Sequence, residues 1–238
     1  MLTVKNICKS YGSKKVVDNI SLNVFPGEIV GLLGPNGAGK TTTFYIIAGI
    51  VKLDDGYVYL DDEDITDIPI YMRAKKGLAY LPQEQSVFRR LSVEDNIKIV
   101  LEENNYSEEE IETITNAMLK EFQIEHLRKQ KASVLSGGEK RRLEIARTLS
   151  LSPRFILLDE PFAGVDPILV SDIQNMVLKL KNKGIGIIIT DHNVREALKI
   201  CDRAYVISNG KILSQGTPEE ISKDKLVIKS YLGEGYVI

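Results

Sequence analysis

Three features are scarce in this sequence of 238 residues: cysteine, a charge surplus of one sign, and long apolar runs. The two cysteines, Cys8 and Cys201, match no metal-ligand spacing and indicate a reducing compartment. The 31 basic and 33 acidic residues leave a net charge of −2, without the basic excess typical of nucleic-acid binders. No apolar run approaches the ~20 residues of a membrane span, and residues 1–11 contain no signal-peptide hydrophobic region. We therefore expect a cytoplasmic globular chain that binds no nucleic acid and reaches a membrane only through partner proteins.

The most informative stretch is rich in glycine and fits the G-x-x-x-x-G-K-[ST] pattern of a phosphate-binding loop. Residues 28–33 predict a buried strand before it, and residues 41–48 predict a helix after it, which is the context that the pattern requires. Backbone N–H groups, Lys40 and the hydroxyl of Thr41 then bind the phosphates and a magnesium ion. An ordinary glycine-rich turn is the alternative. The expected nucleotide contacts are Gly34, Asn36, Gly37, Ala38, Gly39, Lys40, Thr41 and Thr42.

Apolar periodicity predicts an α/β fold that a helical stretch interrupts. The expected strands cover residues 2–7, 16–25, 28–33, 57–60, 77–81, 155–158, 185–190, 204–208 and 211–214, with a hairpin turn at Asn209-Gly210. The expected helices cover residues 41–48, 97–101, 108–122, 139–151, about 169–180, and 194–200. We interpret the chain as one domain, with an N-terminal β-layer, a core built from residues 1–87 and 153–238, and a helical insertion over residues 88–152.

Polar residues gather at the ends of three of these elements. Leu135-Ser136-Gly137-Gly138-Glu139 opens a helix, with Ser136 as N-cap and two glycines that leave N–H groups accessible to an anion, although a plain helix cap is the alternative. Asp159 and Glu160 follow a buried strand, at the end where ligands gather in parallel sheets. An isolated histidine is more often structural, but His192 follows the strand predicted at residues 185–190.

In this order along the chain, the motifs together with Gln83 and Gly164-Val165-Asp166 resemble the nucleotide-binding subunits of ABC transporters, over essentially the whole chain. The resemblance implies a P-loop NTPase (RecA-like) core with an antiparallel N-terminal β-layer. It also implies a homodimer of subunits facing head to tail. Each ATP is then held by one phosphate loop and by the partner's signature segment, of which Ser136, Gly137 and Gly138 are the contacts, while Asp166 lies at the shared interface.

The same resemblance implies the catalytic roles. Asp159 holds Mg²⁺ directly or through water, Glu160 polarises the attacking water, and His192 orients the γ-phosphate and that water. Gln83 touches Mg²⁺ and the water. Tyr11, expected in a turn, stacks on the adenine unless it is an ordinary surface tyrosine.

Finer details resemble the ATPases of lipopolysaccharide-export (Lpt) transporters. In that family a groove beside Gln83 receives integral membrane subunits, which implies docking near Phe88, Arg89 and Arg90 at the cytoplasmic face of the inner membrane. A solvated basic loop is the alternative reading of these three residues. The matching segments are Tyr80-Leu81-Pro82-Gln83-Glu84, 88–93, 162–167, 191–196 and the ending Tyr231-Leu232-Gly233-Glu234.

Other functions stay open at this point. The ATPases of branched-chain amino-acid importers share the Tyr-Leu-Gly ending, so the ending does not discriminate. Chromosome-organising and DNA-repair ABC ATPases need a long coiled coil, but residues 93–134 show no sustained heptads. Ribosome-associated ABC proteins normally carry two such domains in one chain. A small-molecule kinase would leave residues 135–139 unexplained.

Overall fold

The computed structural model describes residues 1–233. The chain divides into two compact units. One is formed by Met1–Tyr80 and the chain from Arg154 onwards, and the other by Leu81–Pro153. Glu234, the last residue of the ending quoted above, lies outside the described residues.

The first unit begins with an antiparallel sheet of four strands in the order β2-β1-β4-β5. The strands are β1 (Leu2–Tyr11), β2 (Lys14–Val24), β4 (Asp55–Leu60) and β5 (Glu63–Asp64). Leu2 and Val4 are buried and alternate with more exposed neighbours, as expected for a sheet with one face on the core. The predicted N-terminal antiparallel layer is confirmed. The placement of Tyr11 in a turn was wrong, because Tyr11 pairs with Lys14 and ends β1.

The second sheet of this unit has six strands in the order β10-β9-β3-β8-β7-β6. The strands are β3 (Ile29–Leu33), β6 (Leu78–Leu81), β7 (Phe155–Asp159), β8 (Gly186–Thr190), β9 (Arg203–Ser208) and β10 (Lys211–Gly216). The pairs of β3 with β8, β3 with β9 and β7 with β8 are parallel, whereas β10 returns antiparallel through the predicted Asn209-Gly210 hairpin. Every residue of β3, β7 and β8 is buried, which explains their continuous apolar sequences.

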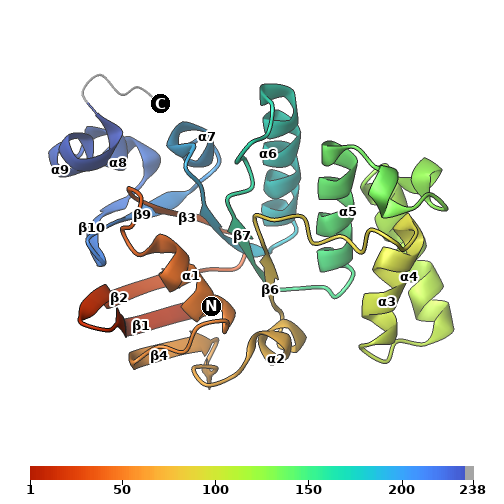
Figure 1. The fold of residues 1–238 in the computed structure, drawn as a ribbon, viewed down its shortest axis with the longest axis horizontal. Helices are drawn as coiled ribbons and strands as arrows, with labels where there is room; N and C mark the ends of the chain where they lie inside the picture. Colours follow the sequence, from red (N-terminus) through yellow and green to blue (C-terminus); the bar gives the residue numbers. More distant parts are fainter. Residues whose placement is uncertain (234–238) are drawn as a thin grey trace. The chain divides into compact units, whose positions relative to one another are not determined.

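Helices cover both faces of the six-stranded sheet. Figure 1 shows α1 (Lys40–Ala48) and the antiparallel sheet on one face, and α6 (Pro167–Asn182) and α7 (Val194–Leu198) on the other. Apolar side chains from the antiparallel sheet, from α1 and from the inner face of the parallel sheet form one core, with Phe44, Ile46 and Ile47 of α1 fully buried. The α1 helix is therefore held on two sides, and its first residues are those of the phosphate loop.

A buried arginine fixes the other end of α1. Arg73, on α2 (Ile70–Lys75), is 2% exposed and donates to the carbonyl oxygens of Ile46 and Ile47 at 2.8 and 2.7 Å. It also donates to the carbonyls of Thr66 and Ile68. Burial lowers the pKa of Arg73 to about 10. A cation at a helix C-terminus, where carbonyls lack partners, is favourable for α1.

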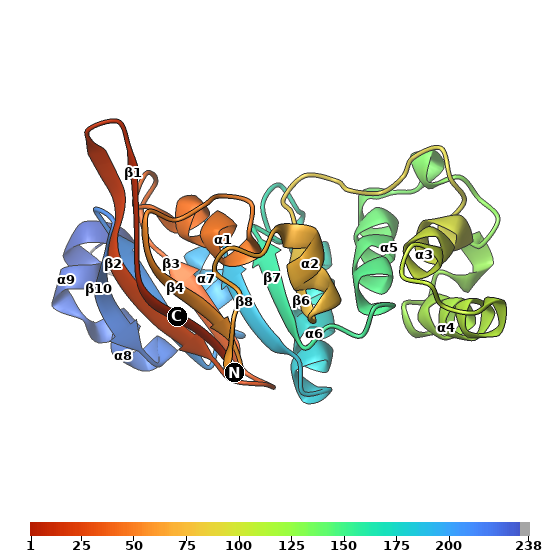
Figure 2. The same ribbon diagram turned by 90° about the horizontal axis from the view of Figure 1, so that it is seen from below.

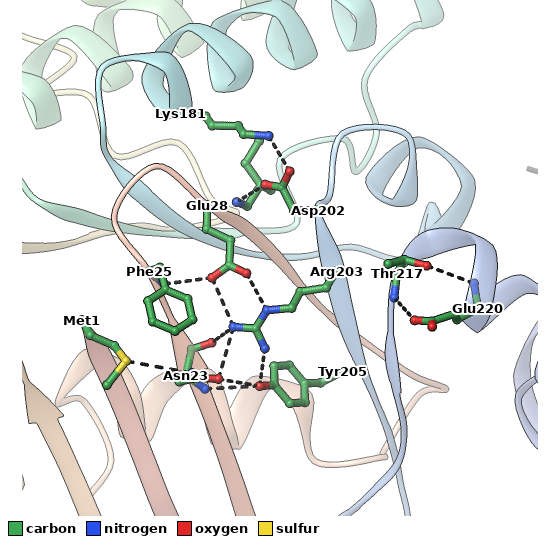
Figure 3. A network of polar contacts seen from close by, with 11 residues as sticks. Met1, Asn23, Phe25, Glu28, Lys181, Asp202, Arg203, Tyr205, Thr217 and Glu220 are labelled. Atoms are coloured by element: carbon green, nitrogen blue, oxygen red, sulfur yellow. Dashed lines mark hydrogen bonds and ion pairs between the residues drawn. The ribbon is translucent and has the colours of Figure 1, made fainter.

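A second polar network joins the two sheets at the start of β3 (Figure 3). Arg203 forms an ion pair with Glu28 and donates to the Asn23 carbonyl at 2.6 Å, and also to the Tyr205 hydroxyl. Asn23 belongs to β2, whereas Arg203 and Tyr205 belong to β9. This network lies at the end of β3 opposite the phosphate loop, so it orients the β-layer without entering the site.

The second unit is helical, with α3 (Val93–Glu102), α4 (Glu108–Glu121) and α5 (Gly137–Leu149) packed together (Figure 2). Short 3₁₀ turns at Glu125–Leu127 and Ala132–Val134 connect α4 to α5. An ion network ties the helices: Glu94 of α3 pairs with Arg128 and Lys129, and Arg128 also pairs with Glu112 of α4. The three helices predicted in this region are confirmed. The α3 helix begins at Val93, four residues before the predicted start, because Ser92 caps it, whereas α5 begins directly after Ser136, its predicted N-cap.

Several short elements were not predicted. They are β5, α2, α8 (Pro218–Lys223), α9 (Lys225–Val227) and a π-helical turn at Ile228–Leu232. The sequence does signal α8, because Thr217 and Glu220 form a reciprocal capping box with Pro218 at the first helical position.

Candidate functional site

The phosphate loop lies between β3 and α1, as predicted, and its backbone depends on two glycines. Gly34 has φ 146° and Gly39 has φ 106°, both in the region that favours glycine. A Cβ atom would lie 2.1 Å from the Ile207 carbonyl oxygen at Gly34, and 2.4 Å from the Val16 carbonyl oxygen at Gly39. Any side chain would therefore displace the loop. The backbones of β2 and β9 therefore lie directly against the loop.

The loop presents a cation and an uncapped helix start. Lys40 is 6% exposed, and its Nζ donates to the carbonyl oxygens of Gly34 and Pro35 at 2.7 and 3.0 Å. Burial lowers the pKa of Lys40, and the charge of Glu160 partly opposes this shift. The N-cap of α1 is Gly39, which has no side chain to cap the helix, so the N–H groups of its first turn remain available to an anion. Thr41 is exposed and Thr42 half-buried at this helix start.

The end of β7 supplies the first carboxylate. Asp159 is the last residue of the strand and is 5% exposed. Its Oδ2 accepts a hydrogen bond from the Tyr80 hydroxyl at 3.0 Å. Burial raises the pKa of Asp159, whereas the Tyr80 hydrogen bond and the charge of His192 lower it. Sequence reasoning assigned Tyr80 no role, since only the pairing order of the sheet places β6 beside β7.

The second carboxylate faces the histidine. Glu160 Oε1 lies 2.6 Å from His192 Nε2, and the His192 side chain is 52% exposed. Glu160 has φ 44°, a left-handed conformation that is uncommon outside glycine and typical of functional sites. Its backbone N–H donates to the Thr190 carbonyl at 2.7 Å. Burial raises the pKa of Glu160, and the positive charge of His192 opposes that shift. The phosphate loop, Asp159, Glu160 and His192 thus belong to one compact unit.

Asp166 and Tyr11 also belong to the first unit. Asp166 directly precedes α6, and its Oδ1 accepts a hydrogen bond from the Leu169 N–H at 3.2 Å. The exposed ring of Tyr11 lies near the Lys9 ammonium, which is 5.7 Å from the ring centroid. On the same hairpin, the backbone carbonyl of Val16 lies so close to Gly39 of the phosphate loop that no Cβ would fit between them. The hairpin that carries Tyr11 therefore reaches the loop.

The other predicted residues lie in the helical unit. Gln83 is exposed in the bend that follows β6. Ser136 is the N-cap of α5 in a reciprocal capping box: its Oγ accepts from the Glu139 N–H at 3.4 Å, and its own N–H donates to Glu139 at 2.8 Å. Gly137 is exposed and Gly138 half-buried at the first turn of α5. The predicted N-cap is confirmed as a structural feature.

The segment after Gln83 is tied firmly to α5. The buried carboxylate of Glu144 accepts from the Ser86 N–H at 2.5 Å and from Arg141 Nη1 at 3.2 Å. Arg147 donates to the Ser86 hydroxyl at 2.7 Å, and its guanidinium lies 4.9 Å from the centroid of the Phe88 ring. Phe88, Arg89 and Arg90 are exposed. These three side chains therefore follow directly after a backbone segment that α5 holds in place.

Comparison with known proteins decides the family. The profile of the ABC transporter family matches residues 17–163, more than half of the chain. The chain belongs to the ABC transporter family. A second profile, of the branched-chain amino acid ATP-binding cassette transporter, matches residues 211–237.

Relatives in this family match nearly the full chain. The chain is 55% identical over 236 residues to the lipopolysaccharide export system ATP-binding protein LptB of Escherichia coli, covering 99% of this chain and 98% of that protein. Among solved structures, an ATP-binding cassette of an ABC transporter in its ADP conformation has a TM-score of 0.89 and 33% identity, covering 98% and 99% of the two chains. A dimeric cassette in a post-hydrolysis state with ADP and Pi has a TM-score of 0.79 and 26% identity, covering 92% and 99%. The predicted fold class, a P-loop NTPase core with an antiparallel β-layer and a helical part, is confirmed.

Within residues 1–233, no helix has the length and apolarity needed to cross a membrane.

Proposed function

We propose that this chain is the ATP-hydrolysing subunit of an ABC transporter that extracts lipopolysaccharide from the inner membrane and drives its export. The observation that carries the proposal is the 55% identity to LptB over nearly the whole of both chains. The paired Glu160 and His192 in the same unit as the phosphate loop supply the chemistry that hydrolysis needs.

The residues of the loop suit ATP and Mg²⁺. We assign ATP to the N–H groups and side chains of Gly34, Asn36, Gly37, Ala38, Gly39, Lys40, Thr41 and Thr42. The metal donors on offer, the Thr41 hydroxyl and the Asp159 carboxylate, are both hard oxygens. Mg²⁺ usually takes most of its ligands from substrate phosphates and water, so two protein donors suffice. When bound, Mg²⁺ neutralises charge on the phosphates.

Three side chains are assigned to the attack on the γ-phosphate. Glu160 acts as the general base toward the attacking water, and the burial that raises its pKa brings it closer to the working range of a base. His192 orients the γ-phosphate and the water through its bond to Glu160. Gln83 contacts Mg²⁺ and the water from the segment that leads into the helical unit.

Two copies of the chain complete each site. We assign Ser136, Gly137 and Gly138 to the ATP held by the partner's phosphate loop, and Asp166 to the shared interface. The dimeric cassette among the structural relatives supports this arrangement. Tyr11 is assigned to the adenine ring, because its hairpin reaches the phosphate loop through Val16.

The helical unit is assigned to the membrane partners. We propose that residues 88–152 form an insertion in a single ATPase domain, and that Phe88, Arg89 and Arg90 receive integral membrane subunits. The chain then lies on the cytoplasmic face of the inner membrane and is held there by those subunits. The exposure of all three side chains supports the assignment.

One observation favours a second candidate, the ATPase subunit of a branched-chain amino-acid importer: the profile match at residues 211–237. Depletion of the protein in its native cells separates the two functions. Export predicts that lipopolysaccharide accumulates at the inner membrane while uptake of leucine, isoleucine and valine is unchanged. Lost uptake with normal lipopolysaccharide delivery would replace the export function by import and leave the ATPase assignment standing.

A further inference from the structure

The residue directly before His192 carries a buried carboxylate that has no role in the proposed chemistry. Asp191 follows the last residue of β8 and is fully buried. Its Oδ2 accepts a hydrogen bond from the Phe162 N–H at 2.8 Å, and its Oδ1 accepts one from the Asn193 N–H at 2.7 Å. Both oxygens are thus engaged by backbone groups from two separate loops.

The two loops are those that carry the catalytic pair. Phe162 lies two residues after Glu160, and Asn193 comes directly after His192. The Glu160 N–H donates to the Thr190 carbonyl, one residue before Asp191. Glu160 itself is held at a positive φ, a conformation that persists only where the surroundings enforce it. The Asp191 side chain therefore links the backbone that follows Glu160 to the backbone that follows His192.

The chemistry of the contact requires a carboxylate. An ionised carboxylate only accepts hydrogen bonds, and here each oxygen faces an N–H donor. An asparagine would keep one acceptor and turn an NH₂ group toward the second N–H. An apolar residue would leave both backbone N–H groups without this acceptor, so the two loops would lose the link that Asp191 provides.

We propose that Asp191 is a positioning residue for ATP hydrolysis, which sets the distance between Glu160 and His192 by holding the two loops together. The proposal rests on the ATPase activity assigned above, and it concerns the catalytic step and not the binding of ATP. Displacing a catalytic group by ~1 Å can lower a rate by about 10²-fold.

Steady-state ATP hydrolysis by the full-length chain tests this role. Asp191→Asn should lower kcat by roughly tenfold and Asp191→Ala by about 10²-fold, the size expected for a misplaced catalytic group. The KM for ATP should stay within about twofold of that of the unaltered chain, because Asp191 bonds neither to the phosphate loop nor to α1.

A matched control is available at the opposite end of the same sheet. Asp202 Oδ2 also accepts a backbone N–H, that of Ile29, at 2.9 Å, and its other oxygen pairs with Lys181 (Figure 3). Asp202→Asn should lower the melting temperature but leave kcat within about twofold, since Ile29 lies at the end of β3 opposite the phosphate loop. Equal losses of kcat in Asp191→Asn and Asp202→Asn would show that only general stability is involved and would overturn the proposal.

A double-mutant cycle keeps the test decisive if the single variants are less stable. Residues that act as a unit have non-additive effects, so Asp191→Asn in a His192→Ala background should change kcat by no more than about twofold. If the kcat of the double variant fell by the product of the two single losses, Asp191 would not act through the Glu160–His192 pair. The assay measures hydrolysis alone, so it is independent of whether lipopolysaccharide is the transported substrate. If His192→Ala alone left kcat unchanged, the catalytic assignment of His192 would fail, and positioning by Asp191 would fail with it.

Discussion

Glu160 Oε1 and His192 Nε2 lie 2.6 Å apart, although the two residues follow different strands of the parallel sheet. The adjacent strands end in register, with Asp159 opposite Thr190, so the residues just beyond them are brought together. The pair therefore depends on the pairing of β7 with β8 and not on any local motif.

This pair leads to the first prediction. Glu160→Gln should bind ATP normally but hydrolyse it roughly 10²–10⁴-fold more slowly, the usual loss when a general base is removed. Phosphate release and the binding of a fluorescent nucleotide would be measured on the same preparation. The control is Glu219→Gln, which alters an exposed glutamate on α8. Near-normal turnover in Glu160→Gln would remove the assigned role.

The second prediction separates a helix cap from a nucleotide contact. Ser136 and Ser107 are N-caps with the same reciprocal capping box, on α5 and α4. Ser136→Arg and Ser107→Arg should both lose a cap worth about 1 kcal/mol. Only Ser136→Arg should prevent dimerisation with MgATP, tested by light scattering in a Glu160→Gln background. If Ser107→Arg prevents dimerisation equally, the effect comes from helix stability, and the assignment of Ser136 to the partner's ATP is contradicted.

Features encoded by local sequence could be predicted before the structure. The phosphate loop needs only its glycines and the flanking apolar runs, and the N-cap at Ser136 needs only a capping residue and an acceptor three positions later. The Asn209-Gly210 hairpin follows from two residues that accept positive φ.

Features that depend on partners distant in sequence could not be predicted. Arg73 looks like an ordinary surface arginine in sequence, yet it is buried because four carbonyl groups, two of them from α1, converge on it. Tyr80 and Asp159 form a hydrogen bond because β6 lies next to β7, and the sequence of neither strand determines which strands are neighbours. Tyr11 was misplaced because the turn that follows it needs only two residues, Gly12 and Ser13.

The third prediction concerns pH and the ion network of the helical unit. Hydrogen bonds from Lys98 and Arg128 lower the pKa of Glu112 from 4.5 to about 2. A carboxylate whose pKa is lower in the folded than in the unfolded state stabilises the folded state at pH values above the unfolded-state pKa. This contribution is lost as the pH falls toward the folded-state pKa. Glu112→Gln should therefore lower the melting temperature at pH 7, and the difference from the unaltered chain should shrink between about pH 4 and pH 2. A difference that stays constant over this range would contradict the assigned ion pairs.

The last prediction tests the docking assignment of Phe88. The backbone of Phe88 is held by the fully buried Asn96, which accepts from its N–H at 2.7 Å and donates to its carbonyl at 3.1 Å. The ring is 45% exposed and lies against the Arg147 guanidinium. An aromatic side chain fixed in advance loses little freedom on binding, which is typical of interface hot spots.

Phe88→Ala should therefore weaken association with the membrane subunits by at least about tenfold, a loss within the range measured for hot-spot residues. ATP binding by the isolated chain should be unchanged. Asn96→Ala should weaken association less, because the ring remains but its backbone is no longer held.

Tyr57→Ala is the matched control, since Tyr57 is an aromatic residue of similar exposure, 52%, on β4. Recovery of the tagged chain with its membrane subunits from detergent extracts measures all three. If Tyr57→Ala reduces recovery as much as Phe88→Ala, or if Phe88→Ala has no effect, the partners bind elsewhere. Residues 88–90 would then be the solvated basic loop that their sequence also allows.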